Sequence, residues 1–340
     1  MTETITQRSR LRERVGLFGG VGLALFATLG ALAIGSADLS ASAVLAALVG
    51  GGTATARTIV WQVRVPRVLA ALLAGGGLAV AGAVMQTVLR NPLGAPYTLG
   101  ISQAAAFGAA IAIVAGITDG PLGTLQTPIA AFAGGLVSTG VILALVTYRE
   151  ATPETMILTG VALGSLFSAG LTLIQYLASD TETAAIVYWT FGDLGRAGWW
   201  QVGLLAAVVG LASLYFLRHG WDYDVLDAGT ATARSLGVNV TRLRIGGMAV
   251  ASLVTALVVS FVGIIGFVGL VAPHLVRMVI GGTERSLLPG SILTGATLLV
   301  AADTAARTVL APVVLPVGIL TSLLGAPLFL YLVVRGGAYW

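Results

Sequence analysis

The sequence predicts an all-α integral membrane protein with about ten transmembrane helices. Hydrophobic residues make up 57% of the 340 residues and charged residues only 9%, whereas soluble domains carry about 25% charged residues. Apolar runs long enough to cross a hydrocarbon layer of about 30 Å recur along the chain. Because a soluble fold of this length could not bury so much apolar surface, most of these helices are expected to lie in lipid.

The first apolar run, residues 15–35, follows four arginines within the first 14 residues. A cleaved signal peptide has a shorter apolar core and a small-residue cleavage site. We therefore expect this run to be retained as the first transmembrane helix, preceded by a cytoplasmic arm over residues 1–14.

Nine further runs follow, separated by polar or helix-breaking residues. The ten expected spans are residues 15–35, 66–88, 98–117, 125–147, 155–178, 197–217, 245–264, 267–281, 288–305 and 315–335. The eighth is short and follows the seventh closely, so nine spans is the alternative. Ten spans place most arginines and both termini on the cytoplasmic side, as the positive-inside rule requires. The whole chain, 1–340, is then one transmembrane domain.

The sequence carries no recognisable catalytic or metal site. Cysteine is absent, and the two histidines, His219 and His274, are far apart in the chain. No phosphate-binding loop and no paired carboxylates occur. The net charge of +4 is too small and dispersed to indicate nucleic-acid binding. We expect no cofactor, no metal and no enzyme activity of its own, with lipid as the surrounding partner.

Charged residues are also missing from the centres of the spans, which disfavours an ion-coupled carrier. Asp303 lies near the outer end of the ninth span, four residues before Arg307. The simplest interpretation of this spacing is a local acid–base pair on one helix.

The longest polar stretch between spans covers about residues 218–244 and is expected in the cytoplasm. Its middle, Leu226 to Leu236, has helical composition, and Gly237 is a plausible stop. This stretch is either a solvated connector or a docking element for a cytoplasmic partner.

Two segments near the second span contain helix-breaking residues. Pro66 is expected in a first helical turn, and the flanking Arg64 and Arg67 would be interfacial anchors or an electropositive docking site. Residues 90–100 contain two prolines and two glycines. Non-helical backbone at membrane depth must be buried or line a water-filled cavity, so this segment is either a tight turn or a wall of a passage.

Two further segments lie near the C-terminus. Pro273 predicts a short, bent eighth helix in which His274 and Arg277 share a face. Residues 315–329 place Gly318, Ser322 and Ala326 at four-residue spacing, which suits close helix packing or a dimer seam.

Five segments together resemble the FecCD-type permeases of ABC importers for iron–siderophores, haem and cobalamin. They occur in family order and cover most of the chain: WQVRVPRVLAALLAGGGLAVAGAVMQTVLRNPLGAPYTLG, ILTGVALGSLFSA, ARSLGVNVTRLR, GFVGLVAPHLVRM and LPVGILTSLLGAPLFLYLVVR. The resemblance implies a type II ABC importer permease architecture with a passage at the seam between two permease subunits, expected to be a homodimer. It also implies two cytoplasmic ATP-binding subunits and an extracytoplasmic substrate-binding protein.

The resemblance also assigns roles to single residues. The residues that it assigns to ATPase coupling are Asp227, Ala231, Arg234, Ser235, Leu236 and Gly237. Those assigned to docking of the binding protein are Arg64, Arg67 and Arg307. Those assigned to the passage or its gate are Thr152, Pro153, Glu154, Ser165, Ser168 and Ser322. The gate departs from the family pattern, because Pro153 and Glu154 replace small hydroxyl residues there.

The predicted function is that of a multi-pass permease in the cell membrane, importing an iron–siderophore, a corrinoid such as cobalamin, or a haem-type chelate. A separate ATPase would hydrolyse the ATP. The alternative is a secondary, ion-coupled transporter of a small solute, which would carry coupling acids at the midplane and an inverted repeat. Permeases for all three chelate classes share these segments, which therefore do not select the substrate.

Overall fold

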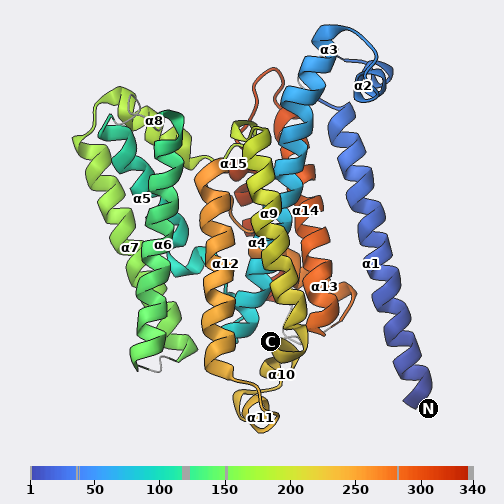
Figure 1. Cartoon of the computed structure of the whole chain (residues 1–340), viewed down its shortest axis with the longest axis vertical. Coiled ribbons are helices and arrows are strands. Elements are labelled where there is room, and N and C mark those ends of the chain that lie inside the picture. Colours follow the sequence, from blue (N-terminus) through green and yellow to red (C-terminus); the bar gives the residue numbers. More distant parts are fainter. Residues whose placement is uncertain are drawn as a thin grey trace.

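The computed structural model describes residues 2–35, 37, 39–116, 123–149, 152–281 and 283–335, and within them it is a helical bundle (Figure 1). Each expected span contains one helix, so the predicted all-α architecture of ten main helices is confirmed. The ten helices are α1 (Thr2–Ala33), α4 (Val65–Val88), α5 (Ile101–Val114), α6 (Gln126–Arg149), α7 (Pro153–Leu177), α9 (Trp199–Arg218), α12 (Val240–Val262), α13 (Val268–Val279), α14 (Glu284–Thr308) and α15 (Val317–Arg335).

Short helices lie at the two ends of the bundle. At one end, α2 (Ala41–Leu48) and α3 (Ala54–Thr58) follow α1, as the upper part of Figure 1 shows. At the other end, α10 (Gly220–Asp227) and α11 (Thr230–Ser235) lie on the same side as the start of α1. We call these the α3 end and the α11 end. A further helix, α8 (Asp180–Thr190), follows α7.

Helix α1 begins at Thr2, so the expected arm over residues 1–14 continues the first transmembrane helix without a break. The helix lies at the side of the bundle (Figure 1), where it packs mainly against α14. Its other face exposes Phe18, Phe26 and Leu29. Such a face suits contact with lipid, because these side chains are exposed and unpacked within the described part of the chain.

The second span begins earlier than predicted. A continuous helix runs over Ala54–Val88, through α3, a π-helical segment (Ile59–Arg64) and α4. Pro66 lies in the first turn of α4, as predicted, but the π-helical segment before it makes the helix continuous, so Pro66 does not mark the start of the whole helix. The backbone N–H of Val65 donates to the carbonyl of Val60, five residues back. This wider turn accommodates a proline that has no N–H and would crowd an ordinary α-helix.

Helix α4 is the centre of the bundle and packs against α14, α12, α13 and α9. Glycines allow the closest approaches. A Cβ at Gly75 would overlap the carbonyl oxygen of Gly295 on α14, and one at Gly82 would overlap Gly269 on α13. Small residues at helix contacts are the usual means of close packing in membranes, as the high glycine content predicts.

Helices α5 and α13 are too short to cross the bilayer alone. Their 14 and 12 residues give lengths of about 21 and 18 Å, less than the roughly 30 Å of hydrocarbon. Each is preceded by a non-helical segment, residues 89–100 before α5 and 263–267 before α13, apart from the short 3-10 turn η2 (Pro96–Leu99). These two segments complete the crossings and shape the candidate site.

Candidate functional site

A cavity of about 390 Å³ lies within the bundle where the two non-helical segments meet. Leu78, midway along α4, lines the cavity, which places it near mid-depth. Most of its wall is apolar. The hydroxyl-bearing residues on it are Tyr97, Thr98, Ser102, Thr255 and Ser322.

Both non-helical segments contribute backbone to this wall. Residues from the range 93–98, before α5, line the cavity, and so do residues 264–267, before α13. Asn91 satisfies the first segment locally, because its side chain accepts from the N–H of Leu93 and its carbonyl from that of Gly94. The expectation of a tight turn is thus met in part, and the same residues also form a cavity wall.

Phe267 has an unusual backbone conformation at this cavity. Its φ of +65° lies in the left-handed region, which a residue with a side chain rarely adopts. Gly325 of α15 packs directly on the Phe267 ring, since a Cβ there would overlap it. Strained backbone of this kind concentrates at functional sites.

The structure separates the serines assigned to the passage. Ser322 is exposed on α15 and lines the cavity. Ser165 and Ser168 are exposed on α7 and are not among the cavity-lining residues. Helix α7 buries few of its residues, although it carries several hydroxyl groups on its open surface.

The residues assigned to the gate form the start of α7. The side chain of Thr152 accepts a hydrogen bond from the N–H of Thr155, and Pro153 occupies the first turn. This is an ordinary helix start, and Glu154 is exposed on it. Nothing in this geometry gives these three residues a gating role, which remains a prediction.

The expected helix over Leu226–Leu236 is broken into α10 and α11, so that part of the prediction was wrong. Gly229 between them has a φ of +127°, a conformation open mainly to glycine, which is why the helix cannot continue. Gly237 ends α11 with a φ of +83°, as predicted.

The residues assigned to ATPase coupling share one property. All six are exposed at the α11 end: Asp227, Ala231, Arg234, Ser235, Leu236 and Gly237. Buried apolar residues hold the segment in place from beneath, among them Tyr223, Leu226 and Ala233. The pair α10–α11 is therefore an anchored projection whose assigned residues face outward.

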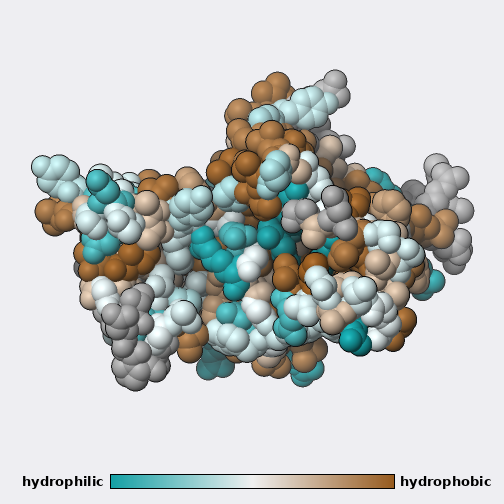
Figure 2. Space-filling view, turned by 90° about the horizontal axis from the view of Figure 1, so that it is seen from above, coloured by the Kyte–Doolittle hydropathy of each residue, from teal (hydrophilic) through white to brown (hydrophobic). Residues whose placement is uncertain are grey.

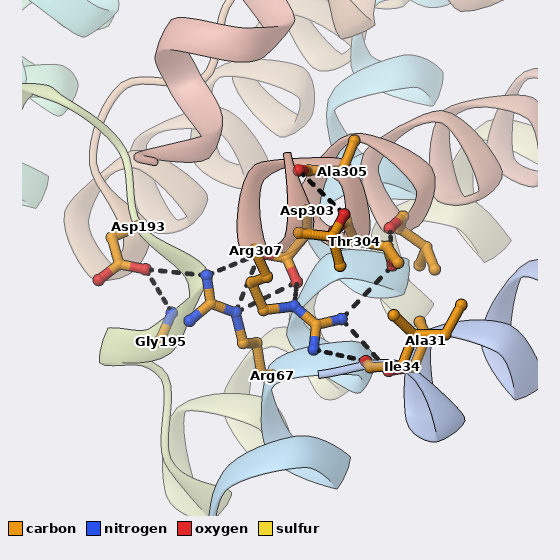
Figure 3. Close-up of polar contacts among 11 residues, drawn as sticks. Ala31, Ile34, Arg67, Asp193, Gly195, Asp303, Thr304, Ala305 and Arg307 are labelled. Atoms are coloured by element: carbon orange, nitrogen blue, oxygen red, sulfur yellow. Dashed lines mark hydrogen bonds and ion pairs between the residues drawn. The ribbon is translucent and has the colours of Figure 1, made fainter. Parts of the chain in front are cut away.

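The arginines assigned to docking are largely covered by the chain, with side chains that contact other parts of the bundle. Figure 3 shows these contacts for Arg67 and Arg307. Arg64 is only 4% exposed and donates to the carbonyls of Leu32, Ala33 and Ala37. The carbonyls of Leu32 and Ala33 are the last two of α1, so the Arg64 guanidinium caps that helix and also holds the chain that follows it at Ala37.

Arg307 and Arg67 share a buried carboxylate. Arg307, 5% exposed, donates to Asp303 at 3.0 Å and to the carbonyls of Ala31 and Ile34. Arg67 contacts Asp303 at 2.8 Å and Asp193 at 3.4 Å. The predicted Asp303–Arg307 pair is confirmed, but it is one part of a cluster that joins α1, α4, α14 and the chain before α9.

Only part of this cluster reaches the surface. The side chain of Asp193 is 40% exposed and that of Arg67 is 12% exposed. Viewed from the α3 end, hydrophilic residues gather near the centre of the face, with hydrophobic residues around them (Figure 2). The docking assignment stays a prediction, and the observed contacts give Arg64 and Arg307 an internal structural role.

No metal centre is found in the described ranges, since no three or more histidine or acidic side chains there lie close enough to share an ion. The candidate site thus has three parts. They are the mid-depth cavity, the exposed α11 projection at one end of the bundle and the arginine cluster at the other end.

Comparison with known proteins agrees with this arrangement. The profile of the FecCD transport family matches residues 23–335. A protein of Methanocaldococcus jannaschii assigned as an ABC transporter permease is 50% identical, over 97% of this chain and 98% of that protein. The cobalamin import permease BtuC of Halobacterium salinarum is 44% identical over 82% of this chain and 74% of its own length.

Two further matches extend the comparison. The hemin transport permease HmuU of Yersinia pestis is 38% identical over 89% of this chain and 92% of its own length. A solved inward-facing structure, assigned to the metal-chelate type of ABC transporter, superposes with a TM-score of 0.83 at 32% identity, covering 94% of this chain and 98% of that one. Because the family profile matches residues 23–335, this chain belongs to the FecCD transport family of membrane permeases.

Proposed function

We propose that this chain is the membrane-spanning subunit of an ATP-driven ABC importer for a metal chelate of the siderophore, haem or corrinoid class. The observation that carries the proposal is the mid-depth cavity between two non-helical segments, because such backbone is tolerated in a membrane where it is buried or lines a water-filled cavity. The cobalamin and hemin permeases among the relatives support the chelate class.

The passage would be completed by a second copy of the chain. Helix α7 leaves Ser165, Ser168 and Thr172 exposed, and a face rich in hydroxyls fits a protein partner or a hydrated path better than lipid tails. Ser322 is exposed on α15 beside the cavity. A homodimer that joins these two helices would place all four hydroxyls along one seam.

The partners at the two ends follow from exposure. The α11 projection presents Arg234 and its exposed neighbours to a cytoplasmic ATPase, so the α11 end and both termini lie in the cytoplasm. The α3 end faces an extracytoplasmic binding protein. Its docking contacts would come from Arg67, which is the most accessible of the three arginines.

Reconstitution with the ATPase and the binding protein tests the proposed function. We expect uptake of a labelled chelate into vesicles to require ATP and to persist when proton and sodium gradients are dissipated. Arg234→Glu should leave ATP hydrolysis measurable but lower uptake at least tenfold, a size typical of coupling between sites. Arg218→Glu, the same charge change on α9 at the same end, is the matched control.

Two results would contradict this function. Gradient-dependent uptake without ATP would favour the ion-coupled alternative. Normal uptake by Arg234→Glu would remove α11 from ATPase coupling. Testing siderophore, haem and corrinoid chelates in parallel identifies the transported class.

Docking has its own test. Arg67→Gln should weaken capture of the binding protein by about fivefold, equivalent to about 1 kcal/mol for a partly exposed charge, with a smaller effect at high salt. Arg57→Gln, which alters an exposed arginine of α3, should change capture less. Unchanged capture by a folded Arg67→Gln permease would leave this arginine a purely internal role.

A further inference from the structure

A buried polar cluster connects α10 to α14 and α4 at the α11 end. Glu284, the first residue of α14, is only 3% exposed, and Thr87 near the end of α4 is also buried. A buried carboxylate is costly unless hydrogen bonds compensate it. Asp224 on α10, the third member of the cluster, is only half-buried. We call Asp224, Glu284 and Thr87 the α10–α14 joint.

Each contact of the joint ties one helix to another. The Thr87 hydroxyl donates to Glu284 Oε1 at 2.7 Å, which joins α4 to α14. The backbone N–H of Glu284 donates to Asp224 Oδ1, which joins α14 to α10. Burial raises the pKa of Asp224, and the hydrogen bond from the Glu284 backbone opposes this shift.

Asp224 also replaces a missing helix cap. Thr283 occupies the N-cap position of α14, but its side chain makes no capping hydrogen bond. Asp224 accepts from the first turn instead, although it lies 60 residues earlier in the chain. A carboxylate is favourable at a helix N-terminus, both as an acceptor and as a negative charge. The start of α14 is therefore held by the helix that carries the α11 projection.

The joint is not fully satisfied in this conformation. Glu284 Oε2 and the hydroxyl of the fully buried Tyr223 lack hydrogen-bond partners within the described structure. Such groups are rare and destabilising in folded proteins. Tyr223 lies on α10 and Glu284 on α14, so a shift of one helix relative to the other changes the surroundings of both groups.

From the joint, α14 reaches the opposite end of the bundle. Its 25 residues span about 37 Å and end in the Asp303–Arg307 cluster that holds α1 and α4 (Figure 3). In between, Gly75 and Gly295 bring the backbones of α4 and α14 into contact. With so little slack between them, a displacement of one helix moves the other.

We propose that Asp224 and Glu284 are positioning residues for transport: they transmit movement of α10–α11 to the α4–α14 pair, and thereby to the α3 end. This role rests on the proposed function, because it requires an ATPase that acts on α11. The joint is distinct from the exposed residues of α11, because Glu284 and Thr87 are buried, Asp224 is half-buried, and all three make contacts between helices.

The test uses the complete permease with its ATPase and binding protein in vesicles. Glu284→Ala and Asp224→Ala should each raise the number of ATP molecules hydrolysed per chelate imported by about tenfold, the typical scale of coupling between sites. Because the two act in one connection, the double variant should be no worse than the more severe single variant. Asp222→Ala, a neighbouring acid on α10, is the matched control.

Conservative variants separate transmission from folding. Glu284→Gln keeps an acceptor for Thr87 and Asp224→Asn keeps one for α14, so both should restore the stoichiometry to within about twofold of wild type, since the connection depends on hydrogen bonds. Thermal unfolding of each variant in detergent shows whether the fold is kept.

A direct readout follows the conformational change. The chain has no cysteine, so Ser322→Cys provides a single thiol at the cavity. In this background, ATP should change the rate of labelling by an impermeant thiol reagent. Adding Glu284→Ala should abolish that ATP dependence while hydrolysis continues.

The outcomes are distinguishable. If both alanine variants keep the wild-type stoichiometry and ATP-dependent labelling, the proposed role of the joint is wrong. The proposal would also be overturned if the variants lost ATP hydrolysis, uptake and thermal stability together, because that result would show a purely structural role. Absence of any ATP-driven uptake by the wild-type complex would instead contradict the proposed function itself.

Discussion

Replacing Asp303 by alanine should lower the free energy of unfolding by about 3–5 kcal/mol, the usual cost of removing one partner from a buried ion pair. Asp303 is almost fully buried and contacts both Arg67 and Arg307. Its removal leaves Arg307 with backbone carbonyls and a neighbouring hydroxyl but no acid. Thermal unfolding in detergent, followed by circular dichroism, measures the effect.

Asp193→Ala is the matched control for this prediction. Asp193 contacts the same arginine, Arg67, but its side chain is 40% exposed and the distance is 3.4 Å. An exposed pair of this kind contributes about 0–1 kcal/mol. Equal losses in the two variants would mean that burial does not set the strength of the cluster. A small loss of unfolding free energy for Asp303→Ala would mean that Asp303 pairs with Arg307 on its own helix without stabilising the contact between helices.

Replacing Gly75 by leucine should lower the free energy of unfolding by about 3 kcal/mol or more, the upper range for overpacking. A Cβ at this position would overlap the carbonyl of Gly295, which is backbone and cannot rotate away. Helices α4 and α14 must then separate. We expect a lower melting temperature and less monodisperse protein in size-exclusion chromatography.

Gly203→Leu provides the comparison. Gly203 lies on α9, and a Cβ there would meet no atom within 4 Å. Since leucine favours a helix over glycine by about 1 kcal/mol, this variant should be as stable as wild type or slightly more so. If the Gly75→Leu and Gly203→Leu proteins have the same melting temperature, α4 and α14 tolerate separation.

Arginines illustrate how far sequence reasoning reaches in this protein. Apolar runs predicted ten spans, and the positions of the arginines favoured ten over nine, because the positive-inside rule depends on sequence alone. Their partners were not predictable in the same way. Arg12 donates to the carbonyls of Met278 and Val279 at the end of α13, and Arg196 donates to the end of α8. Cationic side chains at helix C-termini satisfy carbonyls left without partners.

Local backbone chemistry was only partly readable from sequence. Gly237 was correctly predicted to end a helix, because a glycine after a helical run commonly takes a left-handed conformation there. Gly229 was missed as a break, although its φ of +127° divides the segment. Pro66 was correctly placed in the first turn of α4, because proline favours that position, but the helix as a whole begins earlier. The π-turn before Pro66, which permits a continuous helix, leaves no pattern in the residues themselves.

By itself, the sequence determined that the chain lies in a membrane, where its main helices are and to which family it belongs. Lipid requires every backbone group to be paired within the chain, so apolar runs of sufficient length become helices wherever they occur. Tertiary structure decided which polar groups meet. Asp303 reaches Arg67 of α4, and Asp224 caps α14 from α10, across 236 and 60 residues of chain respectively. Such contacts depend on helix packing, and no local spacing encodes them.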